Sequence, residues 1–534
     1  MKLSIVKLFR FFLLVICLLG SLTACNNKLA NPNTQLSLHS YSELRSDTLT
    51  LSPSRVRAEI DSCIAHDEDS LTTDYRIRQY YLNRGDFLWI DRKGVDARAD
   101  TVLSWLKTVK DMGFSLKKFH VRQIERDLQR IRSLQFDHVN NINVVMGRLE
   151  YNLSKGFFRY AVGQRFGFMN PDYVFNHLEP SEESSSDSQA VTNYLQLFAL
   201  PMEHATKAFY QLSLRKVKQD SISEFLRTVQ PKSPFYNRLL ALLKTAQGRR
   251  ERNLILCNME RCRWRLKDYP QRHRKYVVVN IPSFALHAVD GTSDLVMRVG
   301  CGTSVTKTPL LMSAVKRMDI NPQWIVPKSI IKKSIVQHAG DNAYFQTKRF
   351  FILERSSGET VDPRRTTRAM LLSPDYAVIQ EGGKENSLGR IIFRFNNDFS
   401  IYLHDTSSKE FFSQENRGVS HGCVRVQKPF KLAVFLLGKK DPHLIERIRY
   451  SMSADISSVQ HHLYDGQDQK EDGEDEGKDD LNHHLLLNTV SVRPPVPIYI
   501  IYYTLYPGKD GQLKRYDDIY SYDRVILHFL RNYQ

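Results

Sequence analysis

The sequence predicts an α+β protein of more than one domain, in which a helical N-terminal domain precedes a mostly-β domain. Three observations lead to this prediction. The chain has 534 residues, more than a single hydrophobic core usually supports. Apolar residues recur with the helical period between about residues 60 and 250. After Arg250 the pattern changes to short β-rich runs bounded by Gly, Pro, Asn and Asp.

The first residues predict an export signal. Met1–Arg10 carries three basic side chains, Phe11–Leu22 is apolar, and small residues then lead to Cys25. Charged, apolar and small residues in this order are typical of a secretory signal peptide, which we expect at residues 1–24. The apolar run is too short for a typical membrane-spanning helix. An uncleaved anchor followed by a coincidental cysteine is the alternative.

Residues 25–55 lack periodicity and are rich in Asn, Ser and Thr, so we expect a tether there. Residues 56–250 form the expected helical domain, with Glu179–Asp187 as an acidic, serine-rich loop. Gly113 is a plausible helix end. The two clearest apolar stripes, which we expect to be core, are Val102, Leu103, Leu106, Val109 and Met112, and Ile142, Val145, Met146, Leu149 and Leu153.

Residues 251–450 form the expected strand-rich domain. Residues 451–485 include the acidic run Gln467–Asp480, which predicts a disordered insertion. Residues 486–534 then return to order and complete the domain. The expected strands are Tyr276–Ile281, Leu295–Val299, Arg390–Phe395, Phe399–Leu403 and Val496–Tyr503, and the last expected helix is Asp523–Leu530.

The net charge of +18 and the pI of about 9.4 favour polyanionic partners such as nucleic acid, anionic lipid or an acidic wall polymer. A basic surface that only keeps the protein soluble is the alternative. The sequence has no RNP, zinc-finger or phosphate-loop pattern, so we expect no nucleic-acid partner.

The cysteines predict a reactive thiol. Of the seven in the sequence, Cys17 would leave with the signal and Cys25 would begin the mature chain. An odd number then remains, which in an exported protein suggests a free thiol. The spacing of Cys257 and Cys262 differs from a CxxC metal pair, so we expect core or disulfide roles for them. The remaining cysteines are Cys63, Cys257, Cys262, Cys301 and Cys423.

The most informative stretches are Ile401–Ser407, with the sequence Ile-Tyr-Leu-His-Asp-Thr-Ser, and Ser420–Arg425, with the sequence Ser-His-Gly-Cys-Val-Arg. Thiol catalysis needs a thiolate, a base that generates it and donors for an oxyanion. A glycine beside the nucleophile lets the backbone approach a carbonyl group closely. Both stretches together supply each of these groups.

These stretches resemble the L,D-transpeptidase (YkuD-type) catalytic domain, whose signature places a histidine upstream of Ser/Thr-His-Gly-Cys-x-Arg. Here His404 precedes Ser420 by 16 positions. The resemblance is closest to the YcbB-like branch and covers roughly residues 80–534. The further matching segments are Asn258–Trp264, Asn321–Pro327, Asn386–Arg390, Tyr402–Thr406, Pro497–Tyr499 and Asp517–Tyr520.

The resemblance implies a helical scaffold domain and a mostly-β catalytic domain with a lid, which we place near 328–375. It assigns Cys423 as the nucleophile, His404 as the general base and Tyr402 as the site tyrosine. The backbone amides of Gly422 and Cys423 would form the oxyanion site. Ser420, His421 and Arg425 match family positions beside the nucleophile; a purely structural role is the alternative for His421 and Arg425. Leu22-Thr-Ala-Cys25 resembles a lipobox, which implies lipidation of Cys25.

The implied activity joins peptidoglycan stem peptides by 3→3 cross-links, from a tetrapeptide donor to the side-chain amine of a diamino acid, without a cofactor or metal. Carbapenem-type inhibitors and a lipid-anchored, periplasm-facing position in the cell envelope follow from the same resemblance. A carboxypeptidase or hydrolase, an inactive wall-binding scaffold, and metal binding by His461, His462, His483 and His484 are alternatives. The connector 226–252 is too short for the wall-binding module usual in this branch.

Overall fold

The computed structural model describes residues 50–91, 94–181, 193–438, 441–454, 456, 481–508 and 510–534. The expected signal peptide at 1–24, Cys25 and the acidic run Gln467–Asp480 lie outside these residues, as does most of the expected tether and of the Glu179–Asp187 loop. The chain divides into two compact units. The first contains the described residues up to Met169, Glu203–Arg265 and Arg524–Gln534, and the second contains Asn170–Met202 and Leu266–Asp523.

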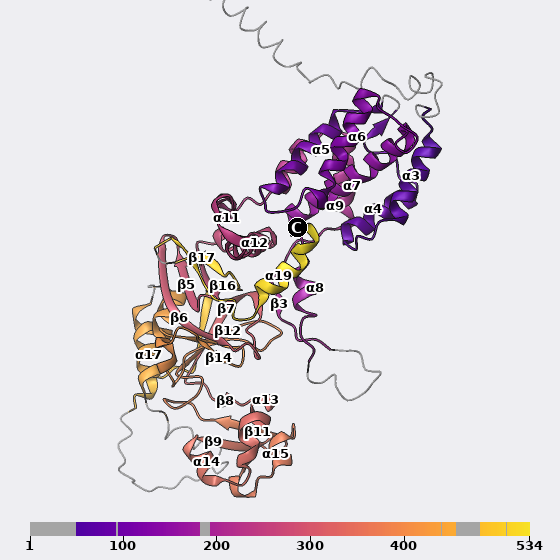
Figure 1. Ribbon diagram of the computed structural model, residues 1–534. Helices are drawn as coiled ribbons and strands as arrows, with labels where there is room; N and C mark the ends of the chain where they lie inside the picture. Colours follow the sequence, from indigo (N-terminus) through magenta and orange to yellow (C-terminus); the bar gives the residue numbers. More distant parts are fainter. Residues whose placement is uncertain are drawn as a thin grey trace, which may run out of the picture. The chain divides into compact units, whose positions relative to one another are not determined.

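The first unit is helical and is built around the long helix α7, which contacts α3, α4, α5 and α6 (Figure 1). The Asn141 side chain caps α7 by accepting from the N–H groups of Asn143 and Val144, and Gly167, at φ +97°, ends it. The helices are α3 Pro53–Ala65, α4 Thr72–Leu82, α5 Ala97–Lys107, α6 Val121–Ser133, α7 Ile142–Phe166, α9 Lys207–Lys218, α10 Ile222–Val229, α11 Pro234–Thr245 and α12 Gly248–Arg263.

The predicted apolar stripes of this unit are confirmed, because all ten of their residues are buried. The first helix is shorter than its stripe: α5 ends at Lys107, and a 3-10 turn, η1 Thr108–Lys110, continues the stripe toward Gly113. Gly113 has φ +84°, as expected of a residue that ends a helical segment.

Buried ion pairs tie α7 to α4 and to the connection between α3 and α4. The Arg159 guanidinium donates to both carboxylate oxygens of Asp74, at 2.7 and 2.6 Å. The Lys155 ammonium lies 2.8 Å from both Asp67 and Asp69. Because both cations are almost fully buried, removing either would leave uncompensated charge inside the protein.

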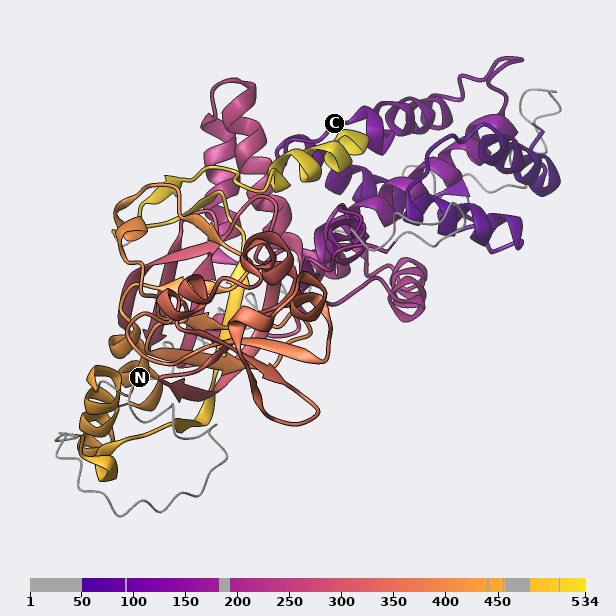
Figure 2. The ribbon, with the colours of Figure 1, turned by 90° about the horizontal axis from the view of Figure 1, so that it is seen from below.

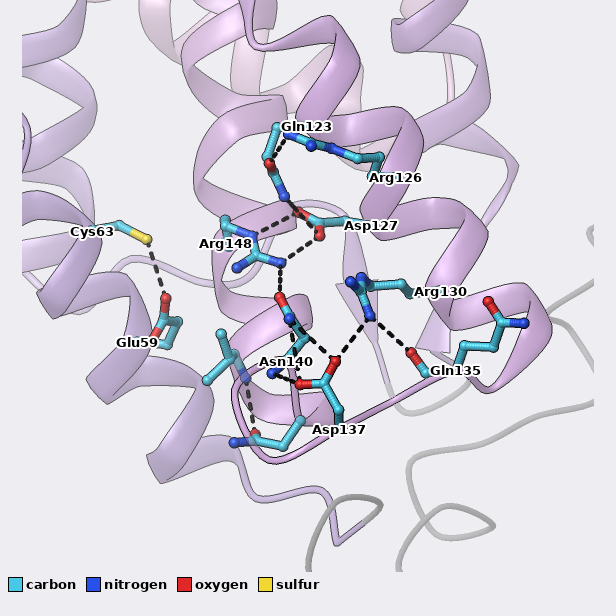
Figure 3. A network of polar contacts seen from close by, with 12 residues as sticks. Glu59, Cys63, Gln123, Arg126, Asp127, Arg130, Gln135, Asp137, Asn140 and Arg148 are labelled. Atoms are coloured by element: carbon cyan, nitrogen blue, oxygen red, sulfur yellow. Dashed lines mark hydrogen bonds and ion pairs between the residues drawn. The ribbon is translucent and has the colours of Figure 1, made fainter.

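A second polar network lies beside α3, α6 and α7 (Figure 3). The Arg148 guanidinium forms two hydrogen bonds with Asp127, at 2.9 and 2.6 Å. Nearby, the Cys63 thiol donates to Glu59 at 3.6 Å. Burial and the Glu59 carboxylate raise the pKa of Cys63 to about 12, so this thiol stays protonated and unreactive at neutral pH.

The second unit is a closed sheet in the order β12-β13-β15-β6-β5-β4-β16-β7, because β7 also pairs with β12 (Figures 1 and 2). Strand β14 pairs with β6, and β3 pairs with β7. The strands are β3 Phe198–Ala199, β4 Lys275–Asn280, β5 Ala285–Asp290, β6 Ser293–Gly302, β7 Leu310–Ile320, β12 Ile391–Phe395, β13 Leu403–His404, β14 Gly418–Ser420, β15 Val424–Val426 and β16 Thr489–Ile501.

Four of the five expected strands are confirmed, as β4, as part of β6, as β12 and as β16. The fifth, Phe399–Leu403, is wrong. Ser400 adopts φ +54°, outside the strand region, and the ladder begins only at Leu403. Helices α16 Pro429–Leu437 and α17 Pro442–Ser453 follow the site strands, and α19 Tyr522–Leu530 confirms the last expected helix.

The segment expected to be the lid has a hydrophobic core of its own. Strands β8 Trp324–Ile325, β9 Phe350–Glu354, β10 Thr360–Val361 and β11 Tyr376–Gln380 form a separate sheet, with helices α14 Asn342–Thr347 and α15 Arg368–Leu372. The sheet extends beyond the expected 328–375 at both ends. Its core residues are Val326, Ile331, Ile335, Phe345, Ile352, Leu371 and Val378.

The boundaries of the two compact units differ from the expected domain boundaries at two places. Residues 170–202 belong to the second unit, because Phe198 pairs with Leu310 of β7. Residues 524–534 belong to the helical unit, where the Tyr533 ring packs against Phe114 and Phe168. Of the segment 486–534 expected to complete the strand-rich domain, the described residues up to Asp523 belong to the second unit and residues 524–534 do not.

Candidate active site

The register of two short strands brings four residues of the motif onto one face of the sheet. Strand β13 pairs in parallel with β15, so that His404 lies opposite Arg425. Side chains alternate between the two faces of a strand. Tyr402 and Cys423, each two residues earlier in its segment, therefore share the face of His404 and Arg425. A hydrogen bond from the Val424 N–H to the Tyr402 carbonyl, at 3.1 Å, extends the pairing to this point.

The Cys423 thiol lies beside Tyr402. The hydroxyl and the backbone N–H of Tyr402 favour the thiolate and lower the pKa of the thiol, and the thiol donates to the Ser400 carbonyl at 3.9 Å. Burial raises the pKa of the thiol, whereas the charges of Arg425 and Arg394 favour the thiolate and lower it. Burial outweighs the other effects, so Cys423 is protonated at neutral pH and needs a base to become a nucleophile.

His404 is a buried and neutral imidazole. It is 4% exposed, and burial together with the Arg425 charge lowers its pKa to about 3. Within the part of the chain that the structure describes, its Nδ1 has no hydrogen-bond partner. A buried polar atom without a partner is rare in native proteins, and a catalytic role is one reason for it. The neutral ring is also the form that can accept a thiol proton.

Residues 420–423, called the nucleophile loop below, have a backbone conformation that requires glycine at position 422. Gly422 has φ +114°, and a Cβ there would lie 3.0 Å from the Ile401 Cδ1. The Ser420 hydroxyl donates to the Cys423 carbonyl at 2.5 Å and accepts from the Gly422 N–H at 3.1 Å. The oxyanion role of Gly422 stays a prediction, and in this structure its N–H donates to the Ser420 hydroxyl. The N–H of Cys423 is the other candidate.

The expected Asn386–Arg390 motif packs against the segment that carries His404. The Asn386 amide donates to the carbonyls of Pro322 and Glu381, at 3.2 and 2.7 Å. Gly389 has φ +64°, and a Cβ there would lie 2.5 Å from the Thr406 backbone nitrogen. This motif therefore packs directly against the residues that follow His404, which gives it a structural role.

Arg394 is a site residue that sequence reasoning missed. Its guanidinium lies 5.5 Å from the centroid of the Tyr402 ring and forms an ion pair with Asp319 of β7. Its charge lowers the pKa of both Tyr402 and Cys423. The pattern of β12 could have indicated it, since Arg394 is the single charged residue in the apolar run Ile391–Phe395.

His421 differs from His404 in being exposed. Partial loss of water around the ring and the charges of Lys333 and Arg425 lower its pKa. Lys333 belongs to the segment η5 Ile331–Ile335 within the expected lid. The positive charge of this segment therefore acts on His421 in the nucleophile loop. The structure thus brings Tyr402 into contact with Cys423, and leaves His421 on the solvent side of the loop.

No group of three or more His, Cys, Asp or Glu side chains in the described ranges gathers closely enough to hold a metal ion. The alternative of a histidine metal site stays a prediction, because His461 and His462 lie outside those ranges. None of the five cysteines Cys63, Cys257, Cys262, Cys301 and Cys423 forms a disulfide in this part of the chain.

Arg425 provides a test of the electrostatics. Replacing it with glutamine removes a charge that stabilises the Cys423 thiolate, so the pKa of the thiol rises further. We expect the pH midpoint of Cys423 alkylation by iodoacetamide to move upward by roughly one unit. Arg425→Lys keeps the charge and should leave the midpoint nearly unchanged. An unmoved midpoint in Arg425→Gln, or an equal shift in both variants, would contradict an electrostatic role.

Comparison with known proteins matches both parts of the chain. Residues 274–445 match the family model described as the L,D-transpeptidase catalytic domain (YkuD), and residues 75–243 match the scaffold domain model. A protein of Haemophilus influenzae that is provisionally named an L,D-transpeptidase is 24% identical over 314 residues. That match covers 59% of this chain and 58% of the relative, so the similarity spans little more than half of each protein.

Proposed function

The chain combines a scaffold domain with an L,D-transpeptidase catalytic domain of the YkuD family, and from this premise we propose that it forms 3→3 cross-links in peptidoglycan. The observation that carries the proposal is the placement of Tyr402, His404, Cys423 and Arg425 on one face of the closed sheet. A thiol, a neutral imidazole on the paired strand and a backbone N–H donor are the groups that covalent acyl transfer requires.

In the proposed reaction, His404 takes the proton of the Cys423 thiol. The sulfur attacks the carbonyl of the third residue of a tetrapeptide donor, a C–S bond forms, and the C–N bond to the terminal D-alanine breaks. The departing amine takes up the proton that His404 holds. The side-chain amine of a diamino acid in a second stem then attacks the thioester, and the new C–N bond replaces the C–S bond while the amine proton returns through His404 to sulfur.

The test uses the purified protein and tetrapeptide muropeptides, with products identified by mass spectrometry. The expected products are a dimer joined by a 3→3 bond and free D-alanine. Water in place of the acceptor amine would give the tripeptide and free D-alanine without a dimer, and the protein would then be an L,D-carboxypeptidase with the same site. No product, together with no labelling of Cys423, would favour an inactive wall-binding scaffold.

The wall-binding module expected in this branch has little room in the chain, because only residues 244–273 separate the two matched regions. Much of this stretch is occupied by α12, Gly248–Arg263, which belongs to the helical unit. We therefore propose that contact with peptidoglycan depends on the scaffold domain, the lid segment and the basic charge of the chain.

We also propose that the protein is lipid-anchored at Cys25 and faces the periplasm. The support is the order of the first residues and the sequence Leu22-Thr-Ala-Cys25. No helix among the described residues is long and apolar enough to span a bilayer. Cys25→Ser should move the protein from the membrane to the soluble fraction, because the acyl chains would be lost. Retention of this variant in the membrane fraction at high salt would contradict the anchor.

A further inference from the structure

The nucleophile loop rests on the turn that joins β6 to β7. The Thr303 N–H and the Thr306 hydroxyl both donate to the Ser420 carbonyl, at 3.2 and 2.8 Å. The Thr308 hydroxyl donates to the Gly422 carbonyl at 2.8 Å. Two of the carbonyl groups that lead to Cys423 are therefore held by hydroxyl groups of this turn.

Thr308 is itself fixed from two directions. It is fully buried, and its hydroxyl accepts from the Gly302 N–H at 2.8 Å. Its backbone N–H donates to the Tyr520 hydroxyl at 3.1 Å, and that hydroxyl donates to the Gly302 carbonyl at 2.8 Å. The Thr308 hydroxyl thus has one donor and one acceptor in place, which leaves it a single orientation. Tyr520, from the Asp517–Tyr520 motif, braces this arrangement.

The hydrogen bond from Thr308 to the Gly422 carbonyl also affects the next N–H group in the chain, that of Cys423. The Gly422 carbonyl and the Cys423 N–H belong to the same planar trans peptide group and point in opposite directions. By holding this carbonyl, Thr308 directs the Cys423 N–H away from the β6–β7 turn. The restraint matters here because Gly422, without a Cβ, allows its neighbouring peptide planes to rotate more freely than any other residue would.

We propose that Thr308, braced by Tyr520, is a positioning residue that aims the Cys423 N–H at the oxyanion formed during acyl transfer. The proposal rests on the proposed acyl-transfer chemistry, but not on peptidoglycan as the substrate. When the sulfur attacks a carbonyl carbon, the carbonyl oxygen gains negative charge, and a fixed N–H stabilises it. An N–H that must first rotate into place stabilises it less.

Two reactions of Cys423 separate this role from a general effect on the thiol. Acylation by 4-nitrophenyl acetate forms a C–S bond, passes through an oxyanion and releases 4-nitrophenolate. Alkylation by iodoacetamide displaces iodide and involves no oxyanion, so it depends only on the thiolate. The ratio of the acylation rate to the alkylation rate therefore measures how well the oxyanion donor is placed. The Cys423→Ala protein supplies the background rate for both reagents.

We expect Thr308→Val to lower the rate of acylation about 10- to 100-fold and to change alkylation by less than about twofold. Thr308→Ser, which keeps the hydroxyl, should restore most of the ratio. Tyr520→Phe removes only the brace and should lower the ratio in the same direction by a smaller factor; it also provides the test if Thr308→Val does not fold. Ser451→Ala also removes a buried hydroxyl that donates and accepts hydrogen bonds in the same unit. This control variant should leave the ratio unchanged.

Equal losses in both reactions would overturn the proposal, because Thr308 would then act on the thiol or on the fold. An unchanged ratio in Thr308→Val and Tyr520→Phe would overturn it too. The assay is independent of the natural substrate. A lowered ratio in a protein that makes no 3→3 dimer would therefore support Thr308 while contradicting the proposed function.

Discussion

Cys423→Ala is expected to abolish the formation of 3→3 dimers and to lower the acylation rate by at least about 10⁴-fold, as loss of a covalent nucleophile does in other acyl-transfer enzymes. The fold should persist, because the substitution removes a single sulfur atom, whose hydrogen bond is to the Ser400 carbonyl. The measurement is product analysis by mass spectrometry, together with a thermal unfolding curve.

Cys63→Ala is the matched control. The Cys63 thiol is held protonated beside Glu59, so its loss should leave both acylation and dimer formation unchanged. Dimers made at the normal rate by Cys423→Ala would remove Cys423 from the mechanism. Loss of activity in both variants would instead point to a structural effect of removing any thiol.

His404→Ala is expected to lower the acylation rate about 10²- to 10⁴-fold, the usual effect of losing a general base. The pH dependence of the acylation rate should identify the base more clearly than the size of the rate loss. The pKa of His404 is about 3 and that of the Cys423 thiol is raised above its usual value. Between about pH 5 and 8 both groups are therefore neutral, and acylation assisted by His404 should be nearly independent of pH.

Without the base, only the small thiolate fraction reacts, so the acylation rate of His404→Ala should rise about tenfold per pH unit in that range. His421→Ala should keep the flat profile of the unmodified protein with a modest loss of rate. If His421→Ala shows the steep profile and His404→Ala does not, the two histidines have been assigned the wrong way round.

The sequence was informative where local patterns decide the structure. The stripe from Ile142 to Leu153 lies in α7 and is buried as expected, although α7 is buried on nearly every side, and the β-branched run at Val277–Val279 lies in β4. The motif residues His404 and Cys423 were identified by resemblance to a family signature; in the structure His404 lies in β13, and Cys423 directly precedes β15, the strand that pairs with β13.

What the sequence could not provide depends mostly on partners distant in the chain. One missed contact is local: the Gly422 N–H is bonded to the Ser420 side chain, which the residue types of the motif do not specify. The contact of Arg394 with the Tyr402 ring requires knowing that β12 lies beside β13. Tyr520 stands more than 200 positions after Gly302, yet their hydrogen bond decides how the nucleophile loop is held.

The assignment of the last residues to the helical unit bears on how the protein is made. Ser115 donates its N–H to the Tyr533 carbonyl at 2.8 Å, and the Tyr533 ring contacts Phe114, Phe119 and Phe168. A domain that is contiguous in the chain can fold while the rest is still being synthesised or exported. Here the helical unit cannot complete its core until residues 524–534 have emerged, so a nascent or cleaved chain without them would expose aromatic surface to chaperones and proteases.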